Sequence, residues 1–252
     1  MPIHTFAIGP LDTNCYVVSR DSDALIVDPG GDRSWGLDTV LQFMERNKLV
    51  LRAVLLTHLH FDHFDEVAAK VLPKALTLFS QSEEEAQILR GMGFDDVRVL
   101  SGEGIAFDGV RLYRTKCDHG SSNLVTVDVY KDRGLTEKAS GVVFESAAET
   151  ERFYLAGDTI YCQLVVDAVE KFKPGIVAVN AAGAQYPLGH LIIMNQYDVR
   201  SLMRRFPTLK VIATHVEGVS HATVNRPMLR EFAKANQLDL LFVPNDGEVL
   251  EF

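Results

Sequence analysis

The sequence "LRAVLLTHLHFDHF", from Leu51 to Phe64, joins a run of apolar and β-branched residues to three closely spaced histidines. An apolar run such as Ala53–Leu56 is typical of a strand that is covered on both faces. His58 and His60 are two residues apart, which places their side chains on one side of an extended chain but on opposite sides of a helix. The spacing therefore predicts a strand that ends in a loop bearing both imidazoles.

Asp62 and His63 follow in the same loop, so four side chains that can bind a metal lie within six residues. The spacing differs from the i, i+4 histidine pair of an HExxH helix. Burying imidazole and carboxylate groups together is unfavourable unless a metal ion or a charged partner compensates. We therefore predict a metal site, rather than a single polar residue that happens to end a strand.

The first and last thirds of the chain alternate between strands and helices. In the first third we expect a hairpin, "NCYVVS" with "ALIVDP", then helices "WGLDTVLQFMERN", "DEVAAKVL" and "SEEEAQILRGMG" and the strand "ALTLF". Ser82 and Glu85 have the spacing of a capping box. In the last third we expect helices "CQLVVDAVEKF", "NQYDVRSLMRRF" and "RPMLREFAKAN", with Pro227 in the first turn of the last one, and strands "GIVAVN", "KVIATH", "LLFV" and "EVLEF".

The middle third reads as short antiparallel strands: "VRVL", "GIAF", "VRLYRT", "NLVTVDVY", "GVVFES" and "RFYLAG", with a tight turn at Asp108-Gly109. The polar segment Lys131–Ser140 is interpreted as a hairpin loop rather than a linker. Together, these patterns predict two sheets packed on each other with helices outside, an α/β four-layer αββα sandwich formed by one domain over residues 1–252.

Further candidate ligands follow directly on other predicted strands. His119 comes after "VRLYRTKCD", Asp158 after "RFYLAG", and His215 ends "KVIATH". Side chains at the carboxyl ends of several strands can meet at one edge of a sheet. We therefore expect these three residues to complete a metal centre with the residues of the first cluster.

This set of residues resembles the metallo-β-lactamase-fold hydrolases. The HxHxDH motif of that family is matched by His58, His60, Asp62 and His63, and the other family positions are matched in order along the chain by His119, Asp158 in "GDT" and His215. The resemblance implies that His58, His60 and His119 hold one ion, that Asp62, His63 and His215 hold a second, and that Asp158 bridges the two. It also implies a water, or hydroxide, bridging the ions.

Two such cations activate water at neutral pH and polarise a carbonyl or phosphoryl oxygen, so we expect a metal-dependent hydrolase. Nitrogen and oxygen ligands suit zinc, manganese or iron. The oxygen-reducing di-iron branch of the family carries glutamate where this chain has His60. Zinc or manganese is therefore favoured over iron, and hydrolysis over redox chemistry. Asp62 is also the expected proton acceptor and donor beside the activated water.

The substrate is indicated by less general features. "NAAGAQ" (180–185), "GHLIIM" (189–194) and "HVEGVSH" (215–221) resemble the branch that contains ascorbate-6-phosphate lactonase. This resemblance implies that His190 and His221 bind or protonate the substrate, that Asn180 shapes the pocket, and that a lactone or related small ester is hydrolysed. "LDTNCYVV" and "DPGG" near the start resemble instead the thioester hydrolase branch that contains glyoxalase II. A thioesterase is therefore the alternative.

Composition excludes other classes. A net charge of -9 disfavours a nucleic-acid backbone, so a phosphodiesterase acting on nucleic acid is the less favoured alternative. The apolar runs are too short to span a bilayer. Three scattered cysteines and an amino terminus without an apolar leader favour the cytoplasm. Cys117, two residues before His119, is interpreted as a packing residue rather than a nucleophile. We expect a small-molecule substrate as partner, and a homo-oligomer is compatible with the sequence.

Overall fold

The computed structural model describes residues 2–9, 11–30, 36–132, 138–186, 190–217, 221–245, 248 and 250. The chain divides into two compact units. Unit 1 consists of Met1–Leu100 and Asn245–Phe252, and unit 2 of Ser101–Pro244. Each unit is built around one sheet, with helices on a face of that sheet. The single domain over residues 1–252 stays a prediction.

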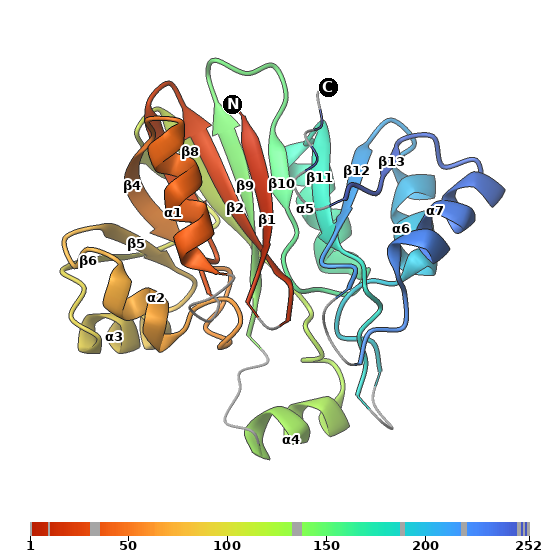
Figure 1. Ribbon diagram of the computed structural model, residues 1–252. Helices are drawn as coiled ribbons and strands as arrows, with labels where there is room; N and C mark the ends of the chain where they lie inside the picture. The colour runs from red at the N-terminus through yellow and green to blue at the C-terminus, as the bar shows by residue number, and fades with distance from the viewer. Residues whose placement is uncertain are drawn as a thin grey trace. The chain divides into compact units, whose positions relative to one another are not determined.

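Unit 1 contains the first half of the strand and helix alternation (Figure 1). Its described strands are β1 (Ile3–Ile8), β2 (Thr13–Arg20), β3 (Asp23–Val27), β4 (Val50–Leu55), β5 (Thr77–Ser80) and β6 (Asp96–Val99). Its described helices are α1 (Leu37–Arg46), α2 (Glu66–Val71) and α3 (Glu83–Gly91). The strands lie side by side in the order β1-β2-β3-β4-β5-β6.

The sheet of unit 1 is mixed. β1, β2 and β3 are antiparallel neighbours, which confirms the predicted hairpin between β2 and β3. β3, β4, β5 and β6 are parallel. Parallel neighbours need a crossover, and the helices α1, α2 and α3 lie in these connections. The carboxyl end of β4, where the histidine loop begins, therefore lies at the same edge as the carboxyl ends of β3 and β5.

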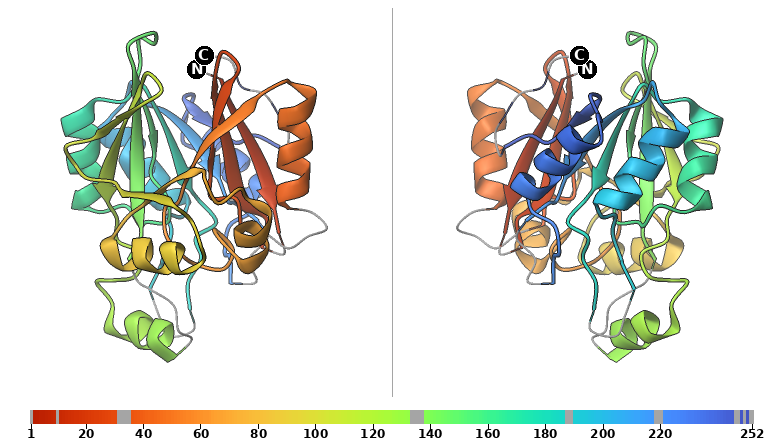
Figure 2. Two further views of the ribbon diagram at one scale, coloured as in Figure 1. Left: turned by 90° about the vertical axis from the view of Figure 1, so that its left-hand side faces the viewer. Right: turned by 90° about the vertical axis from the view of Figure 1, so that its right-hand side faces the viewer.

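Helices cover one face of this sheet (Figure 2). Leu37, Val40 and Met44 of α1 are buried at helical spacing against sheet residues such as Val17 and Ile26. The start of α3 is capped by Ser82, whose hydroxyl accepts from the Glu85 N–H at 3.2 Å. Glu85 returns a contact to the N–H of Gln81 at 3.0 Å, one residue before the position that the capping box predicts.

Unit 2 contains the remaining elements. Its described strands are β7 (Ile105–Phe107), β8 (Val110–Lys116), β9 (Ser140–Ser146), β10 (Phe153–Leu155), β11 (Ile176–Asn180), β12 (Lys210–Thr214) and β13 (Leu241–Phe242). Its described helices are α4 (Leu124–Asp132), α5 (Gln163–Phe172), α6 (Gln196–Arg205) and α7 (Arg226–Ala235). Asp108 and Gly109 between β7 and β8 both have positive φ, 45° and 76°, as the predicted tight turn requires.

The direction of the strands in unit 2 decides where their ends meet. The order is β13-β12-β11-β10-β9-β8-β7. β10, β11, β12 and β13 are parallel, while β9 is antiparallel to both β10 and β8. β8 therefore runs in the same direction as β10, β11 and β12. The carboxyl ends of these four strands lie at one edge of the sheet, as the sequence predicted for the strands before His119, Asp158 and His215.

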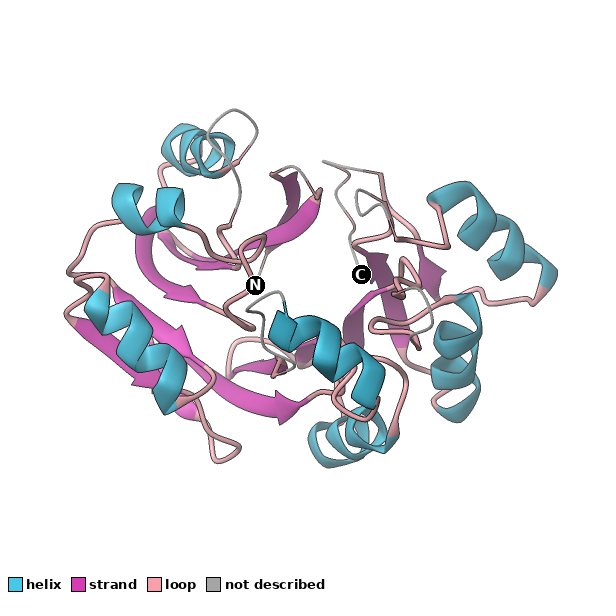
Figure 3. Ribbon diagram, turned by 90° about the horizontal axis from the view of Figure 1, so that it is seen from below, coloured by secondary structure: helices cyan, strands magenta, loops and turns pink. Residues whose placement is uncertain are grey.

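Three helices of unit 2 cover a face of this sheet. Val165 and Val169 of α5, Leu202 of α6 and Leu229 of α7 belong to one buried cluster with strand residues such as Val177. Figure 3 shows the helices of each unit flanking its strands. Asn225 caps α7 by accepting from the Met228 N–H at 2.9 Å, and the predicted proline lies in the first turn.

The structure differs from the sequence-based expectations at several places. "NLVTVDVY" forms helix α4 rather than a strand, and α4 lies beyond the ends of β8 and β9 (Figure 1). The predicted hairpin loop Lys131–Ser140 begins with the last two residues of α4 and ends at the first residue of β9, so it does not join two strands. Its residues 133–137 lie outside the described residues. β1 was not predicted. Its residues are mostly half-buried, so the strand shows no alternation between buried and exposed positions. "EVLEF" falls largely outside the described residues, and Glu248 and Leu250 are not in a strand.

Among the described residues, every helix is too short or too polar to cross a lipid bilayer.

Candidate metal-binding residues

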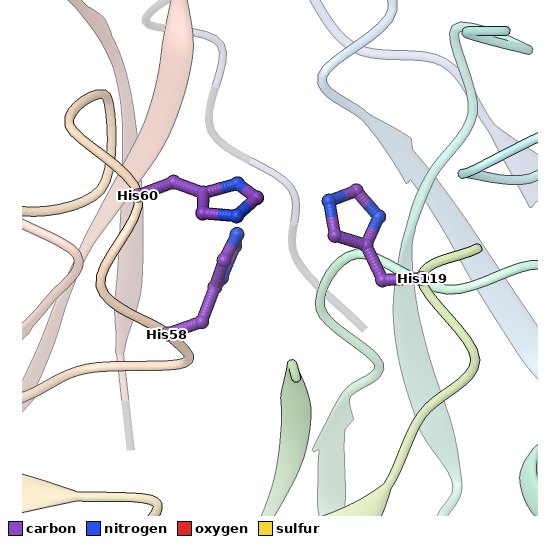
Figure 4. A group of neighbouring side chains, drawn as sticks. All are labelled: His58, His60 and His119. Atoms are coloured by element: carbon purple, nitrogen blue, oxygen red, sulfur yellow. The ribbon is translucent and has the colours of Figure 1, made fainter. Parts of the chain in front are cut away.

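The histidine loop of unit 1 leaves the carboxyl end of β4. His58, His60 and His63 are all buried. The ring centroids of His58 and His60 lie 4.3 Å apart, and Figure 4 shows the two imidazoles beside each other on this loop. The ring centroid of His58 lies 4.0 Å from that of His63. The predicted extended geometry at this spacing is therefore present, and it gathers three imidazoles within unit 1.

Asp28, at the end of β3, holds this loop through its buried carboxylate. Its Oδ1 accepts from the Thr57 N–H at 2.7 Å, and its Oδ2 accepts from the Thr57 hydroxyl at 2.6 Å. The Nδ1 of His63 lies 3.0 Å from the same Oδ2. An ionised carboxylate is an acceptor only, so Nδ1 of His63 carries the proton and the ring's lone pair is on Nε2.

Thr57 fixes the tautomer of His58 in the same way. Because the Thr57 hydroxyl donates to Asp28, its oxygen is an acceptor for the Nδ1–H of His58, which lies 3.1 Å away. The lone pair of His58 is then also on Nε2. Buried partners that fix the tautomer of a histidine in this way are typical of metal ligands. The sequence analysis did not identify Asp28 or Thr57 as site residues.

Asp62 is held by Thr13, the first residue of β2, which lies at the same edge of the sheet as the carboxyl end of β3 because these two strands are antiparallel. Its Oδ2 accepts from the Thr13 hydroxyl at 2.9 Å and lies 3.5 Å from Nε2 of His63. Gly30 permits this packing, because a Cβ there would lie 2.4 Å from the carbonyl oxygen of Asp62. The Gly30 N–H also donates to the carbonyl of His63 at 2.8 Å. Any larger residue at position 30 would displace the ligand loop.

Unit 2 brings its predicted ligands to the shared edge of its sheet. His119 follows β8 and Asp158 follows β10, and both are buried. Nε2 of His119 lies 3.7 Å from Oδ2 of Asp158. Nδ1 of His119 lies 2.9 Å from the carbonyl oxygen of Ile192, which is an acceptor only. Nδ1 therefore carries the proton, and the lone pair of His119 is on Nε2, toward Asp158.

The loops that carry these two ligands are bonded to each other. The Asp118 N–H donates to the Thr159 hydroxyl at 3.0 Å, and the Ile160 N–H donates to the Asp118 carbonyl at 3.0 Å. Thr159 is the threonine of "GDT", directly after Asp158. Its hydroxyl therefore fixes the residue before His119, so the two ligands are positioned together.

The ends of β11 and β12 complete this edge of unit 2. His215 follows β12, is buried, and has a φ of 49°, a left-handed conformation that is uncommon outside glycine. Asn180, predicted to bind substrate, donates its amide Nδ2 to Oδ1 of Asp158. The Thr214 hydroxyl lies 3.0 Å from Oδ1 of Asn180.

The other two residues predicted to contact substrate lie in loops of unit 2 around His119. His190 is exposed, two residues before Ile192. The ring of His221 stacks on Tyr186 with centroids 5.2 Å apart. Tyr186 in turn meets Tyr130 of α4 edge-on at 5.8 Å, and Tyr130 lies 5.5 Å from the His119 ring. Tyr130 was missed because its segment was expected to be a strand.

Cys117 packs rather than reacts. Its thiol donates to the carbonyl of Ala156 at 3.0 Å, and burial raises the pKa of the Cys117 thiol well above its ordinary value. A thiol that stays protonated at neutral pH is a poor nucleophile. This agrees with the packing role expected from the sequence.

The donor atoms in each unit fit a divalent metal. Two ligands about 2.1 Å from one tetrahedral ion lie roughly 3.4 Å from each other. The Asp62–His63 pair in unit 1, at 3.5 Å, and the His119–Asp158 pair in unit 2, at 3.7 Å, are close to this separation. In both pairs the atom nearest the carboxylate is the nitrogen that bears the lone pair. Imidazole and carboxylate donors suit zinc and manganese.

Comparisons with known proteins identify the family to which the chain is similar. The family model of the metallo-beta-lactamase superfamily matches residues 8–215. The UPF0173 protein YddR of Bacillus subtilis (strain 168) is 36% identical over 202 residues, which cover 79% of this chain and 76% of YddR. Among solved structures, isothiocyanate hydrolase from Delia radicum gut bacteria has a TM-score of 0.82 and 28% identity, and the match covers 100% of this chain and 99% of that one. A possible metal-dependent hydrolase from Veillonella parvula DSM 2008 has a TM-score of 0.81 and 28% identity, covering 100% of both chains.

The chain therefore belongs to the metallo-β-lactamase superfamily. The predicted fold class is confirmed, and the chain is a metal-dependent hydrolase of this superfamily.

Proposed function

We propose that this chain hydrolyses a small-molecule substrate at a pair of divalent metal ions, zinc or manganese, with iron less favoured. The proposed ligands are the seven residues that the sequence identified: His58, His60, Asp62, His63, His119, Asp158 and His215. The observation that carries the proposal is the position of Nδ1 in three buried histidines. His58, His63 and His119 each have Nδ1 against an acceptor, which leaves Nε2 as the coordinating atom.

Bound divalent ions would lower the pKa of water toward neutrality and polarise the electrophilic group of the substrate. The two carboxylate oxygens of Asp62 would have different roles. Oδ2 takes the Thr13 hydroxyl and lies beside Nε2 of His63, so it is the ligand oxygen. Oδ1 is then the atom that takes the proton of the attacking water and returns it to the leaving group.

We propose a lactone or related small carboxylic ester as the substrate, on the resemblance to the ascorbate-6-phosphate lactonase branch. His190 and His221 supply the polar contacts. The stack of His221 on Tyr186 supports this assignment, because it places an imidazole beside an aromatic wall that continues through Tyr130 to His119. A thioester remains the alternative within carbonyl chemistry.

An isothiocyanate is a second candidate substrate, favoured by the full-length similarity to isothiocyanate hydrolase. The chemistry is related, since the central carbon of an isothiocyanate is an electrophile that water attacks, as it attacks the carbonyl of a lactone. Both substrates are small and uncharged at the reacting carbon. Such substrates suit a chain of net charge -9 better than a nucleic-acid backbone does. We also propose a cytoplasmic location, because three free cysteines suit a reducing compartment.

A hydrolysis screen of metal-analysed protein tests the substrate. The panel contains lactones, thioesters, isothiocyanates, phosphodiesters and β-lactams, each assayed with zinc, manganese and iron. Turnover of lactones above the other classes supports the first candidate, and turnover confined to isothiocyanates replaces it with the second. Preference for phosphodiesters would reject both.

Asp158→Ala tests the metal centre itself. We expect this substitution to lower the metal content of the protein and to remove hydrolysis while the fold survives, because the carboxylate is a proposed bridging ligand. Metal content is measured by elemental analysis and fold by circular dichroism. A variant that keeps both its metal and its activity would refute the assignment.

A further inference from the structure

Asp158 has two oxygens in different surroundings. Oδ2 is the oxygen near Nε2 of His119, at 3.7 Å, whereas Oδ1 receives the amide of Asn180. Rotation of an aspartate about its last torsion is soft and nearly two-fold, so the carboxylate plane needs a partner to fix it. Asn180 is such a partner. It contacts Oδ1, whereas Oδ2 is the oxygen near His119.

Asn180 is in turn oriented by its neighbour across the sheet. Asn180 and Thr214 are paired in the parallel register of β11 and β12, and the Ala181 N–H donates to the Thr214 carbonyl at 2.9 Å. The Thr214 hydroxyl lies 3.0 Å from Oδ1 of Asn180 and 3.2 Å from the carbonyl of Val179. Asn180 and Thr214 are 6% and 5% exposed, so water does not compete strongly for these contacts.

The chemistry of the amide fixes which way the chain of contacts runs. If the amide of Asn180 were turned over, its carbonyl oxygen would face the carboxylate of Asp158 and two acceptors would meet. Nδ2 therefore faces Asp158 and Oδ1 faces Thr214. The hydroxyl of Thr214 stabilises this orientation by donating to Oδ1, which is nearer to it than the Val179 carbonyl.

We infer that Asn180 and Thr214 are positioning residues that set the carboxylate of Asp158 for metal binding. This inference rests on the proposed role of Asp158 as a metal ligand. It gives Asn180 a task different from the substrate contact that the sequence predicts, since Asn180 acts through Asp158. The donated hydrogen bond holds Oδ1 and turns Oδ2 toward the atoms of His119 with which it would share an ion.

The substitutions Asn180→Ala and Thr214→Val test the inference through metal affinity. Removing a hydrogen-bond partner of a metal ligand lowers affinity by about 10- to 100-fold. We expect Asn180→Ala to weaken zinc binding within this range in competition with a chromophoric chelator. Thr214→Val should have a smaller effect in the same direction, while Thr214→Ser, which keeps the hydroxyl, should restore the wild-type affinity.

Two controls separate positioning from general damage. Thr208→Val removes an exposed threonine of the same unit and should leave affinity unchanged. The Tm of each metal-free variant shows whether the fold is affected. A spectrum of the cobalt-substituted protein reports the geometry of the ions directly, and we expect Asn180→Ala and Thr214→Val to change it, but not Thr208→Val.

A double substitution tests the direction of the contacts. Because Thr214 acts through Asn180, Thr214→Val should add little to the loss of affinity in an Asn180→Ala background. Additive losses would overturn the proposed chain. A raised KM with unchanged metal affinity in Asn180→Ala would overturn it in favour of a substrate contact. Failure of the wild-type protein to bind zinc, manganese or iron would instead reject the proposed function, which keeps the two failures distinct.

Discussion

Asp28 shows how one residue can orient several proposed metal ligands. Its carboxylate accepts from both the backbone and the hydroxyl of Thr57 and from the ring of His63. Its φ of 51° is left-handed, a conformation that aspartate and asparagine tolerate better than most residues. The backbone turn after β3 and the orientation of two imidazoles thus depend on the same side chain.

We predict that Asp28→Asn weakens metal binding by about 10- to 100-fold. Asparagine suits the backbone angle equally well, so the change isolates the loss of an acceptor. The NH2 of asparagine has to face either the Thr57 N–H or, at the other position, the Thr57 hydroxyl together with the His63 ring. In both placements a donor meets a donor, so either the backbone or the His63 tautomer is no longer held. Chelator competition measures the affinity.

Asp38→Asn, on the exposed face of α1, is the matched control and should have no effect on metal affinity. If Asp28→Asn folds and binds zinc as tightly as this control, the carboxylate has no role in orienting the ligands.

Helix α4 shows how local composition can mislead at the scale of an element. Its sequence alternates valines with other residues, which is the period of a strand. Yet Thr126 and Tyr130, four residues apart, are its buried residues, which is the period of a helix. Asn123 starts the helix, because its Oδ1 accepts from the Thr126 N–H at 2.9 Å. The cap was visible in the sequence, but the β-branched pattern outweighed it.

We predict that Asn123→Ala destabilises α4 by about 1 kcal/mol, the usual effect of losing an N-cap side chain. Hydrogen exchange should be faster at the amides of α4 and unchanged in α5. Asn123→Ser or Asn123→Asp, which can also cap, should retain most of the protection. Equal exchange in Asn123→Ala and the wild type would show that the packing of Tyr130, not the cap, maintains the helix.

The elements that carry ligands were easier to predict than α4. The strands before His58, Asp158 and His215 are short apolar runs that end at a polar residue, and such runs identify both the strand and its carboxyl end. The contacts that orient the ligands were not predictable in this way. Asp28 and the Ile192 carbonyl reach His63 and His119 across 35 and 73 residues. Only the pairing of distant segments in the folded chain creates such contacts.

For the whole molecule, the proposed ligand residues are divided between the two units. His58, His60, Asp62 and His63 belong to unit 1, and His119, Asp158 and His215 belong to unit 2. Each group is held by its own hydrogen bonds. Those of unit 1 involve Asp28, Thr57 and Thr13, and those of unit 2 involve Thr159, Asn180 and the Ile192 carbonyl. The proposed pair of ions would take ligands from both groups, and metal binding would then depend on the entire chain.

We predict that zinc raises the Tm of the metal-free protein. A ligand present at 100 times its Kd stabilises the folded state by about 2.7 kcal/mol, which corresponds to roughly 5–10 °C for a chain of this size. Magnesium should give little shift, because it prefers oxygen ligands. The decisive comparison is between His63→Ala in unit 1 and His119→Ala in unit 2, measured by calorimetry with and without zinc. If the two groups share the ions, each substitution reduces the shift caused by zinc. If His119→Ala keeps the full Tm shift that zinc causes in the wild type, unit 1 alone binds the metal. The donors of unit 2 would then add nothing to the stabilisation by zinc.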